Sequence, residues 1–133
     1  MTTIENDRRY TKDHEWTMVD DGDSTVLVVG ITDYAQSQLG DVVMVELPEV
    51  GDNVDQGEVC GAVESPKSVS DIFSPVSGQI VAVNEELLDQ PELVNAQPYD
   101  EGWMLKFRMD EPKQLDELMD AAQYKAFVEE GDD

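Results

Sequence analysis

Short segments rich in valine and isoleucine, separated by glycine, proline and aspartate, restrict this chain to a mainly β fold. β-branched side chains pack well on a pleated sheet, whereas Gly, Pro and Asp favour turns. Residues 42–47 form a nearly continuous apolar run, which predicts a strand covered on both faces. Further strands are predicted over residues 25–31, 58–64, 69–73, 79–84 and 102–109.

A short helix is predicted near residues 32–39. Thr32 is a good N-cap, Asp33 suits the first turn, and Gly40 can end the helix. The chain length of 133 residues suits one domain with a single hydrophobic core. We expect that domain to cover residues 10–129, C-terminal helices included, between a flexible N-terminus at 1–9 and a frayed tail at 130–133.

Two helices are predicted near the C-terminus. Pro112 suits the first turn of one helix, and Asp120 with Gln123 forms a capping-box pattern at the start of another. The apolar residues that these helices are expected to bury are Leu115, Leu118 and Met119 in the first and Tyr124, Phe127 and Val128 in the second.

Acidic residues dominate the charge: 31 Asp and Glu stand against 8 Lys and Arg, a formal net charge of −23. This balance argues against nucleic acid as a partner, because phosphate contacts need clustered basic side chains. It does not predict disorder, because 40% of the residues are hydrophobic and several lie in clear runs. We expect a folded domain with an acidic surface, as in halophilic, salt-adapted proteins.

One cysteine, Cys60, and one histidine, His14, limit the available chemistry. A single thiol forms no intramolecular disulfide and no CxxC metal site, and a lone imidazole offers no zinc cluster. Carboxylate sites for hard cations stay open. No stretch approaches the roughly 20 apolar residues of a membrane helix, and the polar stretch at 1–10 does not match a secretory signal. We therefore expect a cytoplasmic protein that contacts no membrane.

Lys67 is the only lysine or arginine between Lys12 and Lys106. Pro66 suits the second position of a type I turn and thereby puts Lys67 at the tip of a loop between two predicted strands. Proline also excludes the primed turns of the tightest hairpins, because those turns need a positive φ at that position. A somewhat wider loop is predicted.

Three roles fit an isolated, exposed lysine. It can simply balance the charge of neighbouring carboxylates. A catalytic lysine needs burial or a nearby cation to lower its pKa from about 10.4, whereas an acidic field raises the pKa. Post-translational acylation needs only an accessible amine, which a separate enzyme modifies.

Residues 63–71, with the sequence VESPKSVSD around Lys67, resemble the lipoylation motif of the glycine cleavage H proteins. The family usually has a small aliphatic residue, most often valine, where Pro66 stands, and we expect the proline to stiffen the tip. The likeness covers residues 10–129 in order and almost without gaps. It includes YTKDHEW at 10–16, GITDYAQ at 30–36, LGDVV at 39–43, SPVSG at 74–78, Asn84, PELVN at 91–95, Pro98-Tyr99 and Gly102-Trp103.

The resemblance implies a barrel-sandwich hybrid of two antiparallel sheets and a non-catalytic, monomeric carrier with lipoate bound covalently to Lys67. In this family a PLP-dependent glycine decarboxylase loads an aminomethyl group onto the lipoyl arm. An aminomethyltransferase passes the one-carbon unit to tetrahydrofolate, and dihydrolipoyl dehydrogenase reoxidises the arm. A lipoate-attaching enzyme makes the amide.

The resemblance also implies roles for residues around the lysine. Glu15 and Asp71 occupy the positions that contact the loaded arm in a cleft, where a carboxylate can bind the protonated amine and help to exclude water. The flanks that the attaching enzyme recognises are Glu64, Ser65 and Ser68.

Other interpretations stay open. Biotinyl domains usually flank their lysine with methionine, and lipoyl domains of 2-oxo-acid dehydrogenases usually precede it with aspartate; neither pattern is present here. An unmodified interaction or lipoate-relay protein could keep the same fold. A Cys60–His14 dyad is the one enzyme hypothesis that the sequence offers, although a buried strand cysteine is the simpler interpretation because nothing nearby lowers the pKa of the thiol.

Overall fold

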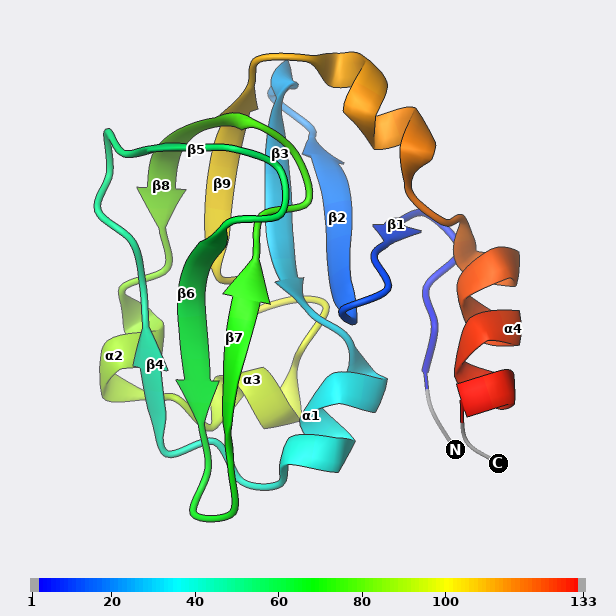
Figure 1. Cartoon of the computed structure of the whole chain (residues 1–133). Coiled ribbons are helices and arrows are strands. Elements are labelled where there is room, and N and C mark those ends of the chain that lie inside the picture. Colours follow the sequence, from blue (N-terminus) through cyan, green and yellow to red (C-terminus); the bar gives the residue numbers. More distant parts are fainter. Residues whose placement is uncertain (1–2, 132–133) are drawn as a thin grey trace.

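A computed structural model describes residues 3–131 as two antiparallel sheets with short helices at their ends (Figure 1). The large sheet has the order β1-β2-β3-β9-β8-β5, and the small sheet has the order β4-β6-β7. The strands are β1 (Arg9–Tyr10), β2 (Glu15–Asp20), β3 (Asp23–Ile31), β4 (Met44–Glu46), β5 (Asn53–Val54), β6 (Val59–Glu64), β7 (Val69–Phe73), β8 (Gly78–Val83) and β9 (Leu105–Met109). The predicted class, a mainly β fold of two antiparallel sheets, is confirmed.

The helices are short and lie outside the sheets. They are α1 (Asp33–Leu39), α2 (Glu86–Asp89), α3 (Leu93–Ala96), the 3-10 helix η1 (Pro112–Glu117) and α4 (Ala121–Gly131). Among residues 3–131, no helix is long and apolar enough to cross a membrane.

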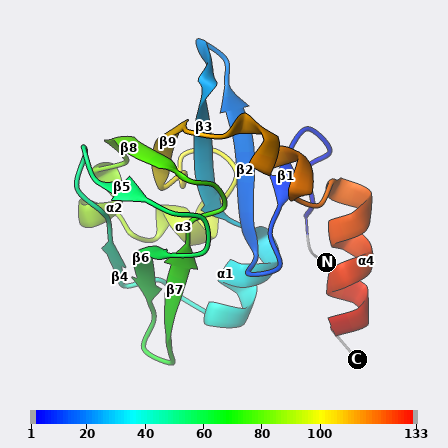
Figure 2. The same ribbon diagram turned by 45° about the horizontal axis from the view of Figure 1, so that its top comes forward.

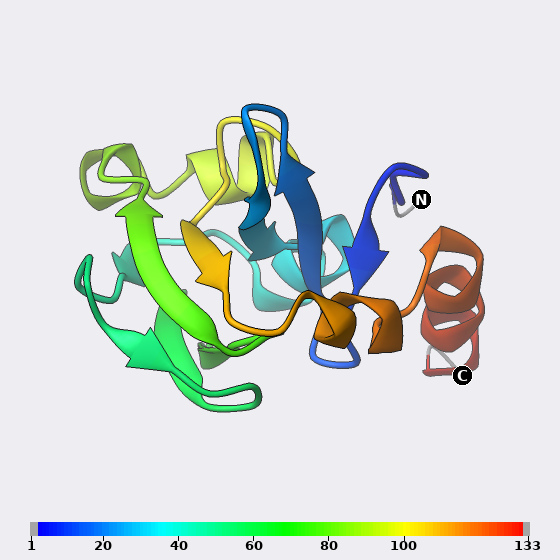
Figure 3. The same cartoon turned by 90° about the horizontal axis from the view of Figure 1, so that it is seen from above.

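The main core lies between the two sheets, and the small sheet covers one side of the large sheet when the molecule is seen from above (Figure 3). Leu27 and Phe107 contribute to this core from the large sheet, and Val63 and Ile72 contribute from the small sheet. Burial of apolar side chains from both sheets removes them from water, and this is the main term that stabilises the fold.

A second apolar cluster covers the other face of the large sheet, where α4 lies beside β1 (Figures 1 and 2). Tyr10 stacks on Tyr124 of α4, with ring centroids 4.5 Å apart. The predicted capping box of α4 is confirmed: the backbone N–H of Gln123 donates to Asp120 Oδ1 at 2.8 Å, and that of Asp120 donates to Gln123 Oε1 at 2.9 Å. The helix continues to Gly131, beyond the predicted end of the domain at 129.

The N-terminal segment, expected to be flexible, contacts the domain over residues 3–9. Ile4 packs against the second apolar cluster. The Arg8 guanidinium lies 4.4 Å from the ring centroid of Trp16 and donates to the Tyr99 carbonyl oxygen at 2.6 Å. A guanidinium over an aromatic face is a favourable contact, which explains why this polar segment packs. Residues 1–2 and 132–133, which belong to the predicted flexible ends, lie outside the described residues.

Two local predictions were wrong. The run at 42–47 forms only the edge strand β4, and Met44 is 51% exposed because nothing in residues 3–131 covers the outer face of the small sheet there. The helix expected after Pro112 is the 3-10 helix η1, which buries no residue fully. By contrast, α1 begins and ends as predicted, with Thr32 as its N-cap and Gly40 at its C-terminus.

Candidate functional site

A tight hairpin presents Lys67. Strands β6 and β7 pair up to Glu64 and Val69, and Ser65 and Ser68 then exchange two backbone hydrogen bonds of 2.8 and 3.3 Å. The loop therefore consists of Pro66 and Lys67 alone, and the prediction of a wider loop was wrong. Among the described non-glycine residues only His14 has a positive φ, so this is not a primed turn.

The side chain of Ser65 explains how a non-primed turn closes this hairpin. Its Oγ accepts hydrogen bonds from the backbone N–H groups of Lys67 at 3.3 Å and Ser68 at 3.1 Å. Ser65 itself is only 4% exposed. A buried hydroxyl with these partners fixes the backbone on which the lysine stands.

The lysine side chain is exposed and reaches toward α1. Lys67 Nζ donates to the backbone carbonyl of Gln38, in the last turn of that helix, at 2.8 Å. The C-terminal carbonyls of a helix carry partial negative charge, so they attract an ammonium. Neither of the two side-chain ion pairs within residues 3–131 includes Lys67, so no carboxylate holds its amine.

A groove of about 330 Å³ lies between α1 and β7, and Lys67 is one of its lining residues. We refer to it as the arm groove. Its polar lining includes Ser68 and Asp71 from the hairpin and Asp13 and His14 from the loop before β2. Its apolar lining comes from Ile31, Leu39, Val63 and Ile72. The exposed lysine thus lies at the edge of a partly apolar groove that two carboxylates, Asp13 and Asp71, also line.

The predicted site residues do not all lie together. Ser68 and Asp71 line the arm groove with Lys67, whereas Glu64 lies on β6 opposite Val69. Glu15 does not line the arm groove. It lines a neighbouring hollow of about 270 Å³, and Asp13 is the residue that lines both spaces.

Glu15 is a buried carboxyl, 1% exposed, at the start of β2. Its Oε1 accepts from the Thr11 hydroxyl at 2.6 Å, and its Oε2 accepts from the backbone N–H of Phe73 at 3.1 Å. Burial raises the pKa of Glu15 to about 7, although these two hydrogen bonds act in the opposite direction. The carboxyl thus supplies an acceptor for a backbone N–H of β7, which is an edge strand of the small sheet.

His14 is a groove residue that the sequence alone did not assign to this site. Its φ of 69° is unusual for a residue with a side chain. Its ring centroid lies 4.8 Å from that of Tyr34, and its Nδ1 is 2.8 Å from the Tyr124 hydroxyl. Burial lowers the pKa of His14, with Asp13 opposing the shift. The sequence YTKDHEW at 10–16 matched the family, but it did not indicate that His14 would lie beside α1 and α4.

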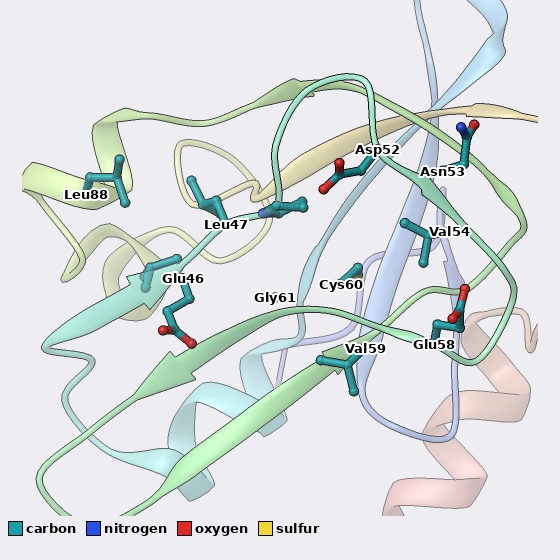
Figure 4. Close-up of a pocket in the computed structure, with 12 residues that line it drawn as sticks. Glu46, Leu47, Asp52, Asn53, Val54, Glu58, Val59, Cys60, Gly61 and Leu88 are labelled. Atoms are coloured by element: carbon teal, nitrogen blue, oxygen red, sulfur yellow. The ribbon is translucent and has the colours of Figure 1, made fainter.

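Cys60 lies elsewhere. It lines a larger open hollow, of about 610 Å³, with Leu47, Val54 and Leu88, and neither Lys67 nor His14 lines that space (Figure 4). The thiol is 6% exposed, and burial raises its pKa to about 12. The expected buried strand cysteine is confirmed, and the structure does not bring Cys60 and His14 into one pocket.

Comparisons with known proteins agree on one family. A family model described as "Glycine cleavage H-protein" matches residues 8–131. The glycine cleavage system H protein of Anaeromyxobacter sp. (strain K) is 56% identical over 127 residues, which cover 96% of this chain and 97% of that protein. The protein of the same name from Chromohalobacter salexigens is 51% identical over 133 residues and covers 100% of both chains. The crystal structure of a glycine cleavage system H protein from Mycobacterium marinum is similar with a TM-score of 0.83 and 44% identity, and the match covers 92% of this chain and 97% of that one.

Proposed function

Because this chain belongs to the glycine cleavage H-protein family, we propose that Lys67 Nζ is the atom to which a lipoyl group is attached through an amide bond. Membership of the family makes the chain a lipoyl-carrier component of the glycine cleavage system and not a catalyst in itself. The observation that carries the assignment of Lys67 is its placement, exposed on a two-residue loop and beside the arm groove.

The residues around Lys67 fit the group. Its amine is held by a single backbone carbonyl, that of Gln38, so little interaction is lost when the amine becomes an amide. The apolar lining of the groove, which includes Leu39 and Ile72, suits a hydrocarbon chain. When bound, the lipoyl group supplies a flexible chain and a disulfide that can be reduced to two thiols.

Asp71 and Glu15 are proposed to contact the loaded arm at different points. Asp71 is exposed and lines the groove with Lys67, so its carboxylate can bind a protonated amine there. A contact with Glu15 requires the arm to pass Asp13 into the neighbouring hollow. Glu15 also holds the Phe73 N–H, and this contact fixes the β7 edge that lies beside the groove.

A lysine on a projecting hairpin can enter the active sites of other enzymes (Figure 1). Family membership implies the glycine decarboxylase and the aminomethyltransferase as partner enzymes. We propose dihydrolipoyl dehydrogenase and a lipoate-attaching enzyme as further partners, with Glu64, Ser65 and Ser68 as flanks that the latter enzyme recognises. A monomeric state and a cytoplasmic location stay predictions.

The mass of the native protein tests the attachment. Protein purified from cells that are degrading glycine should carry one lipoyl amide, and peptide mapping should place it on Lys67. Lys67→Arg keeps the charge but removes the acylation site, so it should abolish carriage and leave the melting temperature unchanged. Lys125→Arg changes an exposed lysine on α4, outside the arm groove and the neighbouring hollow, and serves as the control. Unmodified Lys67 in the native protein would instead support an interaction protein with the same fold.

A further inference from the structure

The outer side of the small sheet carries an apolar hollow next to the Lys67 hairpin. It measures about 150 Å³ and is lined by Met44, Glu46, Ala62, Glu64 and Val69, which we call the hairpin face. The register explains the grouping: Met44 lies opposite Glu64, Glu64 lies opposite Val69, and Glu46 lies opposite Ala62. Directly opposed residues on neighbouring antiparallel strands point to the same side of a sheet.

Two large apolar side chains of this face are open to solvent. Val69 is 60% exposed and Met44 is 51% exposed. Val45, which follows Met44 on β4, is 4% exposed, and Val63, which precedes Glu64 on β6, is 1% exposed, because both point into the main core. Other large apolar residues of the protein are also exposed, Val50 and Leu88 among them, but Met44 and Val69 share a hollow that two carboxylates border and that lies next to the Lys67 loop.

We propose that the hairpin face is the docking surface of the enzyme that acylates Lys67. This inference rests on the proposed function. The partner chemistry follows from the face itself: an apolar side chain enters the hollow between Met44 and Val69, and basic side chains meet the carboxylates of Glu46 and Glu64.

The position of the face selects this partner over the enzymes that act later. An enzyme that acylates Nζ must hold the protein within the reach of one lysine side chain, and Val69 is only two residues from Lys67. Enzymes that act on the far end of a lipoyl arm can bind farther away. In addition, none of the five residues of the face lines the arm groove, and Val63, which does, points to the opposite side of β6.

The reaction needs an activated acyl donor, which the docking enzyme makes from lipoate and ATP as lipoyl adenylate, with release of pyrophosphate. The Lys67 ammonium loses one proton, and the free amine attacks the acyl carbon. The bond from that carbon to the phosphate oxygen breaks, AMP leaves, and the second proton of the nitrogen passes to solvent. The hairpin face binds the enzyme and positions Lys67 for this step, and none of its side chains takes part in the chemistry.

Acylation kinetics of the unmodified full chain test the proposal, with a purified lipoate–protein ligase, lipoate and ATP. Val69→Ser and Met44→Ser should each raise KM about threefold to tenfold and leave kcat unchanged, because they remove binding energy that is the same in ground and transition states. The matched control is Val59→Ser, which changes an exposed valine, 55% accessible, at the other end of the same hairpin. That control should leave KM unchanged.

The two carboxylates of the face, Glu46 and Glu64, give a second and independent test of the proposal. Glu46→Gln should raise KM and weaken its dependence on salt, whereas Glu49→Gln, an exposed glutamate outside the hairpin face, should do neither. Melting curves show whether each variant is folded, and Met44→Ser decides the question if Val69→Ser distorts the hairpin.

Other results would overturn the inference. If wild type is acylated and the hairpin-face variants behave like Val59→Ser, the docking surface lies elsewhere and the proposed function still stands. If kcat falls while KM is unchanged, the residues shape the hairpin and do not bind the enzyme. If acylation is normal but aminomethyl loading slows, the face serves a later partner. If wild type is not acylated, the proposed function fails together with the inference.

Discussion

Replacing Glu15 with glutamine tests how a buried carboxyl links the stability of this fold to pH. Both oxygens of Glu15 accept hydrogen bonds, from the Thr11 hydroxyl and from the Phe73 N–H, and the Thr11 hydroxyl oxygen in turn accepts from the backbone N–H groups of Asp13 and Glu15. A glutamine keeps one of these two hydrogen bonds through its carbonyl oxygen, and its NH₂ group puts a donor where the second acceptor was. Glu15→Gln therefore lowers stability at every pH by the loss of one hydrogen bond, and it also removes the titration of this side chain, so the pH dependence of the stability difference is the readout.

The magnitude follows from the shift in pKa. Burial raises the pKa of Glu15 from 4.5 to about 7 in the folded protein. Each unit of difference between the folded-state and unfolded-state pKa corresponds to about 1.4 kcal/mol of unfolding free energy. Ionisation of Glu15 therefore destabilises the folded state by about 3 kcal/mol. Between these two pKa values the unfolded chain has lost the proton and the folded chain keeps it, and the free energy of unfolding falls as the pH rises. The contribution of Glu15 is complete below pH 4.5 and lost above about pH 7.

Denaturation of wild type and Glu15→Gln at several pH values measures this effect. From about pH 5 to about pH 8 the glutamine variant should gain about 2–3 kcal/mol of stability relative to wild type, or roughly 10 °C in melting temperature. The other acidic residues are common to both proteins, and their effect cancels in the difference. Glu129→Gln, which removes one exposed charge on α4, gives the background effect of net charge. A stability difference that does not change with pH would refute the argument from burial.

Further predictions address the groove, the packing and the surface charge. Asp71→Asn should shorten the lifetime of the aminomethyl-loaded arm, up to about a hundredfold if a charge-assisted hydrogen bond is lost, as measured by ammonia release; an unchanged lifetime in both Asp71→Asn and Glu15→Ala would make these residues ordinary acids. Gly30→Ala should cost about 1–3 kcal/mol in urea denaturation, because a Cβ there would lie 2.7 Å from the Trp16 ring, and equal stability would contradict this packing. The net charge of −23 should make the melting temperature substantially higher in about 3 M than in about 0.1 M KCl, whereas coincident curves would remove the argument for salt adaptation.

The features that the sequence predicted correctly depend on neighbours along the chain. Thr32 caps α1 through the N–H of Ala35, and Asp120 and Gln123 cap α4 through groups three residues apart. The arms of the Lys67 hairpin, β6 and β7, pair across a loop of two residues and were predicted with nearly the observed bounds. Such short-range hydrogen bonds and turn preferences act in any segment with these residues, so they are visible before the fold is known.

The tertiary structure decided which side of each element is covered and which site residues meet. Lys67 contacts Gln38, 29 residues away, and Glu15 contacts Phe73, 58 residues away. The arm groove, the raised pKa of Glu15 and the exposure of Met44 all depend on distant segments that pack together or leave a face open. Desolvation is set by every atom near a group, and the local sequence contains only a few of them; this is why the lysine could be found from its motif, whereas the separation of Glu15 from Asp71 could not.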